Sequence, residues 1–473
     1  MILFRFTAGA ALLACAAVHL LAQPAWPPDA QHRHVIPHGF VTLTGEATSG
    51  ITSEYTYTAE EYRRMASLGA NVQVVRIFFG KIGAWPGHEL DPKYLQRMDR
   101  MVALAKANGI QTIFKLTVYD LAGAGGGAFG SEEWTAFWSD RKGHQDKATQ
   151  AWGRIFEHYK NEPAVIGYDL LNECNKGKLP LAMPAFVANY LVPFYERTID
   201  VLQKTGGNKW VLYQPPITAA PMGTAPKRSR IVYAPHLYSD IREYVISGGT
   251  PNPSKYGPML DRFEKEAAAA GAVLCIAEFG NPPLKINDDD PEKQALHARG
   301  ERAVAEEFDR RAIGSIRPWF CGTRRYFGAP PTELTWALFK GESAASGPER
   351  KYIMDVLARP MPLVIAGKIE TFRFDFGSRE FMMRFVPDPA KGASEIYVPR
   401  QRHFPDGFRV VHSGGLTLAY DSSQPSGFRV LSNTGNFDAA AFRWDAARER
   451  ILVSRWAPAA SAVTLRIIPG IAD

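Results

Sequence analysis

Two glutamates follow apolar stretches of the chain, and their chemistry sets the first expectation. Glu173 ends the run Gly167–Glu173, and Glu278 ends the run Leu274–Glu278. Apolar runs of this length are typical of buried strands. Carboxylates at the ends of two buried strands are suited to acid/base and nucleophilic chemistry.

A carboxylate pair about 5–5.5 Å apart is the arrangement that cleaves glycosidic bonds with retention of configuration. In that reaction Glu173 would protonate the leaving oxygen and later accept a proton from water, and Glu278 would attack the anomeric carbon. Either glutamate alone would also suit a helix cap or the protein surface. Their shared position after apolar strands favours the catalytic interpretation.

The elements that must bring the glutamates together alternate between residues 39 and 320. We expect strands at Phe40–Leu43, Val72–Phe79, Gln111–Thr117, Val165–Leu171, Trp210–Tyr213, Ile231–Pro235, Val273–Ala277 and Gly314–Trp319. We expect helices at Ala59–Leu68, Pro92–Asn108, Lys147–Tyr159, Ala185–Gln203, Met259–Ala270 and Glu292–Arg310. This pattern predicts an α/β fold, a (β/α)8 TIM barrel, in which the carboxyl ends of the strands share one site.

An open, doubly wound sheet is the competing architecture. It would be favoured by a Gly-x-Gly-x-x-Gly turn after the first strand, and the chain has none there. The run Gly123–Gly130 follows the third expected strand and lacks a Lys-Ser/Thr ending, so we interpret it as a loop over a cleft.

Further motifs support the barrel. An arginine follows the second strand, an Asn-Glu pair the fourth, a His-x-Tyr motif the sixth, a glutamate the seventh, and a tryptophan the last. In this order the chain resembles glycoside hydrolase family 5 over almost its whole length. The residues that carry the resemblance are Arg76, Asn172, Glu173, His236, Tyr238, Glu278 and Trp319.

The resemblance implies roles around the nucleophile. Arg76 and Tyr238 would hold Glu278 and keep it ionised, which fits the effect of a guanidinium on a carboxylate. One departure concerns the end of the third strand, where many family members carry a histidine and this chain reads Phe114-Lys115-Leu116-Thr117-Val118-Tyr119-Asp120. Tyr119 or Asp120, just after that strand, could line the sugar site instead.

The same resemblance implies roles toward the sugar. Asn172 would bind the sugar 2-hydroxyl, and His236 would orient either Tyr238 or the sugar. Trp319 would stack under the ring, because an indole offers the apolar face that a pyranose prefers. Structural roles remain open for His236 and Arg76, and core packing for Trp319.

The pattern changes near Gly367, after Pro360 and Pro362 have ended the last helical segment. Alternating strands with Gly, Ser, Asn and Asp turns then predict a small β-sandwich. We therefore expect a signal peptide at 1–22, a catalytic barrel at 23–365 and the sandwich at 366–473.

The C-terminal part also bears on the substrate. Pro331–Trp336 and Glu395–Pro399 look like the end of endoglycoceramidases, which cleave the bond between a glycan and ceramide. Trp134, Phe137 and Trp138 could meet such a lipid or could pack in the core. The alternatives are an endo-β-glycanase acting on a polysaccharide and a non-catalytic protein that binds glycan or lipid.

The N-terminus has one basic residue, Arg5, before the apolar run Phe6–Leu21, a pattern typical of a secretory signal. Leu12–Cys15 also resembles a lipobox, so both simple cleavage near Ala22 and acylation of Cys15 stay open. The protein would be secreted or periplasmic, as a soluble protein or a lipoprotein.

The composition of the chain indicates which kinds of molecule it could bind. The net charge of +7 is spread without blocks of Lys or Arg, which argues against nucleic acid and allows peripheral contact with an anionic membrane. We expect a glycolipid or oligosaccharide substrate, a monomer, and neither metal nor organic cofactor. Only three cysteines follow Cys15, and we expect buried thiols. Asp288–Asp290 is interpreted as a solvated loop.

Overall fold

The structure is a computed structural model that describes residues 26–44, 56–117, 131–217, 220–238, 253–280, 290–322, 337–341, 343–459 and 461–471. Several sequence features lie outside these ranges. They are the expected signal segment with Cys15, Tyr119 and Asp120, the run Gly123–Gly130, Asp288 and Asp289, and the stretch Pro331–Trp336.

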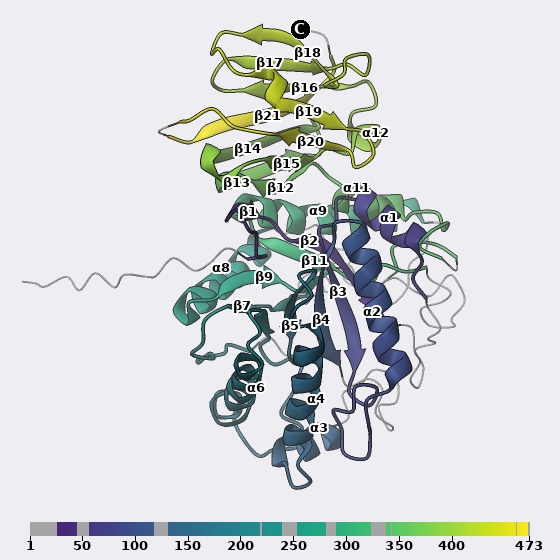
Figure 1. Ribbon diagram of the computed structural model, residues 1–473, viewed down its shortest axis with the longest axis vertical. Coiled ribbons are helices and arrows are strands. Elements are labelled where there is room, and N and C mark those ends of the chain that lie inside the picture. The colour runs from purple at the N-terminus through teal and green to yellow at the C-terminus, as the bar shows by residue number, and fades with distance from the viewer. Residues whose placement is uncertain are drawn as a thin grey trace, which may run out of the picture.

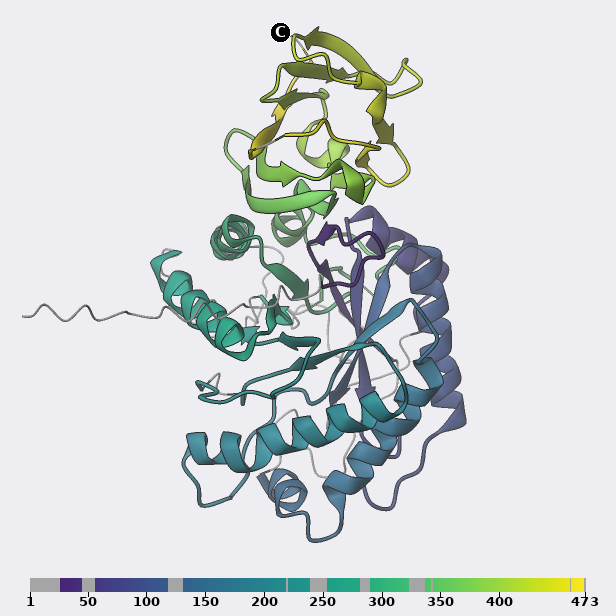
Figure 2. The ribbon, with the colours of Figure 1, turned by 60° about the vertical axis from the view of Figure 1, so that its left-hand side comes forward.

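Eight parallel strands form a closed barrel in the order β11-β2-β3-β4-β5-β6-β7-β9. Their bounds are β2 His38–Leu43, β3 Val72–Phe78, β4 Gln111–Thr117, β5 Val165–Asp169, β6 Trp210–Tyr213, β7 Ile231–Tyr233, β9 Val273–Ile276 and β11 Gly314–Arg317. Figure 2 shows the barrel strands with helices packed around them. The predicted (β/α)8 barrel is confirmed.

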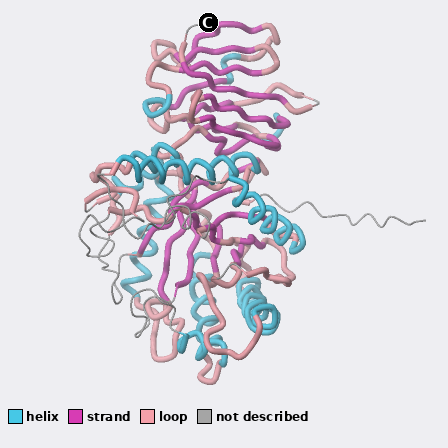
Figure 3. Tube along the Cα trace, turned by 180° about the vertical axis from the view of Figure 1, so that it is seen from behind, coloured by secondary structure: helices cyan, strands magenta, loops and turns pink. Residues whose placement is uncertain are grey.

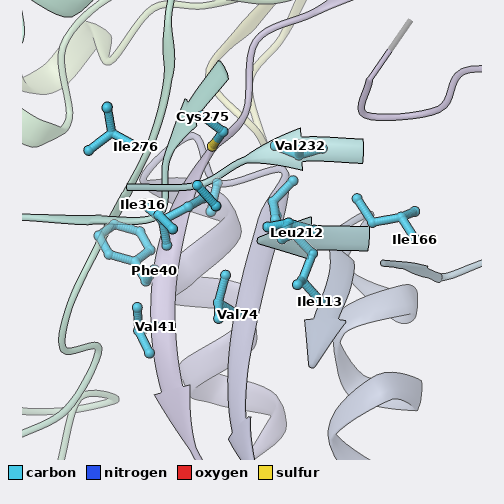
Figure 4. Packing of buried hydrophobic residues seen from close by; sticks show 14 of the residues in the cluster. Phe40, Val41, Val74, Ile113, Ile166, Leu212, Val232, Cys275, Ile276 and Ile316 are labelled. Atoms are coloured by element: carbon cyan, nitrogen blue, oxygen red, sulfur yellow. The ribbon is translucent and has the colours of Figure 1, made fainter. Parts of the chain in front are cut away.

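The barrel core is built from the apolar residues that predicted the strands. Every barrel strand contributes buried side chains, among them Val41, Val74, Ile113, Leu212 and Ile316 (Figure 4). Strands covered on both sides need apolar residues on both faces, which explains why these segments are continuously apolar.

The helices lie outside the strands. They are α1 Ala59–Ser67, α2 Pro92–Ala107, α3 Ser131–Ser139, α4 His144–Tyr159, α5 Met183–Phe186, α6 Val192–Lys204, α8 Pro253–Ala270, α9 Pro291–Arg311 and α11 Lys351–Leu357. A π-helical turn at Val187–Leu191 joins α5 to α6 where one continuous helix was expected. Pro193 has no amide proton, so it cannot donate the regular α-helical hydrogen bond to the residue four positions before it. The π-helical turn accommodates the backbone at this break in the hydrogen-bond pattern.

One connection departs from the repeating pattern. The described part of the segment 214–230, between β6 and β7, contains no helix. A hollow of about 410 Å³ lies there against α8, and its lining includes Tyr213, Tyr233, Lys227 and Arg262. It is separate from both glutamates.

The C-terminal residues, together with the short N-terminal strand β1, form two antiparallel sheets. The first has the order β1-β12-β15-β20-β19 and the second β13-β14-β21-β16-β17-β18. The strands are β1 His34–Val35, β12 Met361–Ile365, β13 Gly367–Asp375, β14 Glu380–Pro387, β15 Ser394–Tyr397, β16 Phe408–His412, β17 Leu416–Tyr420, β18 Phe428–Asn433, β19 Phe442–Asp445, β20 Arg450–Val453 and β21 Val463–Pro469.

Trp456 joins these two sheets. Its ring lies 4.8 Å from that of Phe385 in the second sheet and 5.8 Å from that of Phe442 in the first. The predicted all-β domain is confirmed. Strand β1 comes from the N-terminal region and pairs antiparallel with β12, a contact that local sequence patterns did not predict.

The all-β domain packs on the end of the barrel where the strands begin (Figures 1 and 3). Tyr397 Oη donates to the carbonyl of Ser67 at the end of α1, and Thr371 Oγ1 donates to the carbonyl of Arg310 at the end of α9. Helix ends in this fold lead into the start of the next strand, so the domain lies at the end opposite the two glutamates.

Two further observations concern the whole described chain. No helix within it combines the length and the apolar character needed to cross a membrane. Cys174, Cys275 and Cys321 are free and buried, as predicted.

Candidate active site

Glu278 lies where the seventh barrel strand ends. Strand β9 stops at Ile276, and after Ala277 the chain continues as the short strand β10, Glu278–Phe279. The carboxylate is 1% exposed. Its Oε1 accepts hydrogen bonds from Lys115 Nζ at 2.8 Å and from Arg76 Nη2 at 3.0 Å, and its Oε2 accepts one from Tyr238 Oη at 2.7 Å.

These partners decide the charge of Glu278. Burial by itself would raise the pKa of its carboxyl, but the cations Lys115 and Arg76 outweigh burial and hold the pKa well below its usual range. Burial and the neighbouring carboxylates raise the pKa of Tyr238 well above its ordinary value, so its hydroxyl remains a donor. Glu278 is therefore an ionised carboxylate.

Short strand extensions place His236 beside Glu278. Strand β7 ends at Tyr233, and β8, His236–Leu237, continues beyond Pro235 and pairs in parallel with β10. In this register His236 lies opposite Glu278. The pairing of β8 with β10, outside the eight barrel strands, therefore makes His236 the neighbour of Glu278.

Glu173 follows the fourth barrel strand. Strand β5 ends at Asp169, and Glu173 has a φ of 45°, in the left-handed region that non-glycine residues rarely adopt. Its amide donates to Gln214 Oε1 at 3.0 Å, and its Oε1 lies 2.7 Å from His236 Nδ1. Gln214 thus holds the backbone of Glu173, and His236 holds its carboxyl group.

The two carboxylates lie close together. One oxygen of Glu173, one nitrogen of His236 and one oxygen of Glu278 all lie within 4.8 Å of one another. Carboxyl groups in inverting glycosidases are about 6.5–9.5 Å apart, because a water must fit between them and the sugar. The separation here suits direct attack by one carboxylate.

The same three side chains could offer ligands to a metal ion. Lys115 and Arg76 already occupy Glu278 Oε1, and their two positive charges would repel a divalent cation. This donor set fits a carboxylate pair better than a metal centre.

Asn172 has polar groups available for a ligand. Its side chain is 1% exposed, and neither Oδ1 nor Nδ2 has a hydrogen-bond partner in the described structure. A buried amide without partners costs free energy unless a ligand or water satisfies it. Asn172 therefore offers one acceptor and donors beside Glu173.

Trp319 follows β11, and its indole is buried. The guanidinium carbon of Arg76 lies 4.0 Å from the centre of a Trp319 ring, a cation–π contact. One face of the indole thus holds the arginine that contacts Glu278. From the sequence, stacking under the sugar and packing in the core were the two roles considered for Trp319, and the contact with Arg76 was not predicted.

The structure adds three residues that the sequence interpretation did not assign to the site. Lys115 lies within β4 and forms an ion pair with Asp169. Asp169 accepts a hydrogen bond from Gln214, which accepts one from the Glu173 amide. The signal that could have identified Lys115 was the presence of a lysine within the otherwise buried strand Gln111–Thr117. No local sequence pattern marked Asp169 or Gln214 as site residues.

The three aromatic residues considered for lipid contact belong to the core. Trp134, Phe137 and Trp138 are each at most 2% exposed, and Trp138 Nε1 donates to the carbonyl of Asn175 at 2.7 Å. In the structure they support the segment after Glu173 and offer no surface to a lipid.

Gly280 permits the close approach of β10 to a buried ion pair. Its φ is 133°, and a Cβ there would lie 2.4 Å from Arg317 Cζ, which is held by Glu301 at 3.0 Å. We expect Gly280→Ala to lower the free energy of unfolding by about 2–4 kcal/mol, through backbone strain and overpacking.

Urea denaturation would measure this loss, with Gly206→Ala as the control. Gly206 also has positive φ, 72°, but a Cβ added there would have nothing within 4 Å, so its change should cost only about 1 kcal/mol. Equal losses in the two variants would contradict the proposed clash with Arg317.

Comparison with known proteins agrees with this geometry. A family model described as cellulase (glycosyl hydrolase family 5) matches residues 38–306, more than half of the chain. The chain belongs to glycosyl hydrolase family 5. A second model, the glycoside hydrolase family 5 C-terminal domain, matches residues 359–466.

Two curated endoglycoceramidases are similar to this chain. Endoglycoceramidase I of Rhodococcus hoagii is 24% identical over 319 residues, which cover 62% of this chain and 58% of the relative. Endoglycoceramidase of Hydra vulgaris is 24% identical over 285 residues, 56% of this chain and 48% of the relative. The chain thus matches about half of the length of these curated relatives.

A solved structure shares the whole architecture. Endo-glycoceramidase II from a Rhodococcus species, in complex with ganglioside GM3, superposes with a TM-score of 0.68 at 19% identity. The match covers 95% of this chain and 100% of that one. At this identity the likeness concerns the fold, a barrel followed by an all-β domain.

Proposed function

We propose that this chain is a retaining β-glycosidase that cleaves the bond between glycan and ceramide in glycosphingolipids. The observation that carries the reaction type is the carboxylate pair. Glu278 is buried and bound by two cations and a phenol, and Glu173 has an oxygen within 4.8 Å of it. An ionised carboxylate facing a second carboxyl at this separation is suited to double displacement.

In the first step the Glu278 carboxylate attacks the anomeric carbon and forms a glycosyl ester. The bond from that carbon to the aglycone oxygen breaks, and the proton of Glu173 passes to this oxygen. In the second step the Glu173 carboxylate takes a proton from water. The water oxygen attacks the anomeric carbon, and Glu278 leaves as a carboxylate.

Other side chains around the pair have defined parts in this reaction. Arg76 and Tyr238 hold both oxygens of Glu278 and restrict its direction of attack. Asn172 would bind the sugar 2-hydroxyl with its unsatisfied buried amide, a contact that strengthens in the transition state. Trp319 would support the sugar ring beside Arg76.

Similarity to endoglycoceramidases in both the barrel and the C-terminal domain supports the choice of substrate. Basic charge spread over the chain suits a substrate at an anionic membrane surface. We also propose that the chain is exported, on the grounds of its N-terminal apolar run, and that it acts as a monomer. The spread basic charge would allow peripheral contact with membranes.

The proposed substrate can be tested with lactosylceramide or a ganglioside in detergent, using the chain without residues 1–22. We expect intact oligosaccharide and ceramide as the two products, detected by mass spectrometry. The Glu278→Gln variant should release neither.

Two outcomes would contradict this proposal. Activity on a β-glucan or mannan without release from glycolipids would make the protein an endo-β-glycanase. Binding of glycan or lipid without hydrolysis of any β-glycoside would make it a binding protein on the same fold.

A further inference from the structure

Lys115 on β4 is a fully buried cation beside Glu278. Its side chain is 0% exposed. Its Nζ lies 2.8 Å from Glu278 Oε1, 3.2 Å from His236 Nε2 and 3.6 Å from Asp169 Oδ2. A lysine ammonium has three N–H donors, and three partners surround this one.

The contact with His236 decides where that imidazole carries its proton. An ammonium can only donate, so His236 Nε2 must accept and must be unprotonated. The neutral ring then carries its proton on Nδ1 and donates it to Glu173 Oε1 at 2.7 Å. In the protonated acid, Oε1 is thus the carbonyl oxygen, and the transferable proton is on Oε2.

A second route leads from Lys115 to the backbone of Glu173. Asp169 Oδ2 accepts from Gln214 Nε2 at 2.6 Å, which sets the orientation of that amide. Gln214 Oε1 is then free to accept the amide proton of Glu173, whose φ of 45° needs such support. Burial raises the pKa of Asp169, and Lys115 opposes this by favouring the carboxylate.

We propose that Lys115 is a positioning residue that keeps Glu278 ionised and, through His236 and the Asp169–Gln214 pair, sets the orientation and the proton of Glu173. One cation thereby couples the nucleophile to the acid/base. The proposal rests on the glycosidase reaction given above, but it does not depend on which aglycone is cleaved.

The charges that face Glu278 give the sign of the expected pH effect. Lys115 on β4 and Arg76 on β3 carry the positive charges, and His236 on β8 is neutral. Tyr238 adds a hydroxyl, and Glu173 and Asp169 add carboxyl groups. Lys115→Met removes one of the two full cations, so the pKa of Glu278 rises. Activity requires its ionised form, and the acid limb of kcat/KM therefore moves to higher pH.

We expect Lys115→Met to lose roughly 10²-fold in kcat/KM, the typical effect of removing one preorganised group. Most of the loss should be in kcat. Lys115 contacts Glu278 directly and Glu173 through His236, and its buried side chain has no exposed surface for a substrate. Lys115→Arg keeps the charge, and its acid limb should stay near that of the wild type.

Steady-state kinetics from acid to neutral pH would measure these effects on an aryl β-glycoside or on whichever β-glycoside the wild type cleaves. Lys209→Met is the matched control. Lys209 is a half-buried lysine that donates to the carbonyl of Glu162 outside the site, and its variant should keep the wild-type profile. An unchanged acid limb in Lys115→Met, with lower activity at all pH values, would overturn the positioning role.

A measurement on the wild type covers the case in which Lys115→Met does not fold. Nitrogen-15 NMR of histidine-labelled protein at neutral pH reports the tautomer of His236, assigned by comparison with His236→Asn. We expect protonated Nδ1 and unprotonated Nε2. A protonated Nε2 would overturn the proposal.

The two proposals fail in different ways. A wild type that cleaves a polysaccharide but no glycosphingolipid refutes the substrate proposed above and leaves the kinetic test of Lys115 intact. A wild type with no hydrolysis at all refutes the proposed reaction, whereas the tautomer of His236 still tests the hydrogen-bond network.

Discussion

Glu278→Gln is expected to abolish turnover, with kcat falling roughly 10⁴-fold or more, because the chemistry then lacks its nucleophile. An amide oxygen is a poor nucleophile, and it cannot neutralise the cations that face Glu278. The variant would leave Lys115 and Arg76 buried without their shared anion. Initial rates on an activated aryl β-glycoside would measure the loss.

A covalent test accompanies this variant. A slow 2-deoxy-2-fluoro glycoside should add one glycosyl group to the wild-type peptide that contains Glu278, and the variant should gain none. Glu266→Gln is a control on α8, where Glu266 accepts a hydrogen bond from Tyr233 on the outer side of the barrel, and it should keep its activity. Labelling of another residue would reject Glu278 as the nucleophile.

Glu173→Ala should slow the reaction according to the leaving group. Substrates with basic alkoxide leaving groups, such as ceramide, need the proton and should lose roughly 10²–10⁴-fold in kcat/KM. A dinitrophenyl leaving group needs little assistance and should lose far less in the glycosylation step. The second step would then limit turnover, because no base activates water.

Azide provides a direct check of this assignment. It needs no general base, so it should accelerate turnover of the dinitrophenyl substrate by Glu173→Ala and yield a β-glycosyl azide with retained configuration. Equal losses for both leaving groups, or no effect of azide, would assign the acid/base role elsewhere. His236→Asn is an informative comparison, since it removes the partner of Glu173 but keeps the carboxyl.

The candidate pair of glutamates and the barrel could be predicted from sequence because their signals are local. Glu173 and Glu278 each end an apolar run, and parallel strands of a barrel open onto one site. Arg76 and Tyr238 were assigned by resemblance to a family, and the structure places both of them on Glu278.

Lys115 shows why other parts of the site could not be predicted. Its partners come from β5, β8 and β10, which are separated from it by up to 163 positions in the chain. No pattern within β4 indicates that a buried lysine will face two carboxylates and a histidine. The pairing of β8 with β10 likewise depends on where β7 and β9 end.

By itself, the sequence determined the alternation of strands and helices, the all-β C-terminal domain and the positions of both glutamates, because each depends on a short-range pattern of apolar residues. Only the tertiary structure decided the network of Lys115, the burial of Trp138 and the pairing of β1 with β12. These depend on contacts between residues far apart in the chain. Packing and charge neutralisation in the folded protein select such contacts, and local propensity carries no information about them.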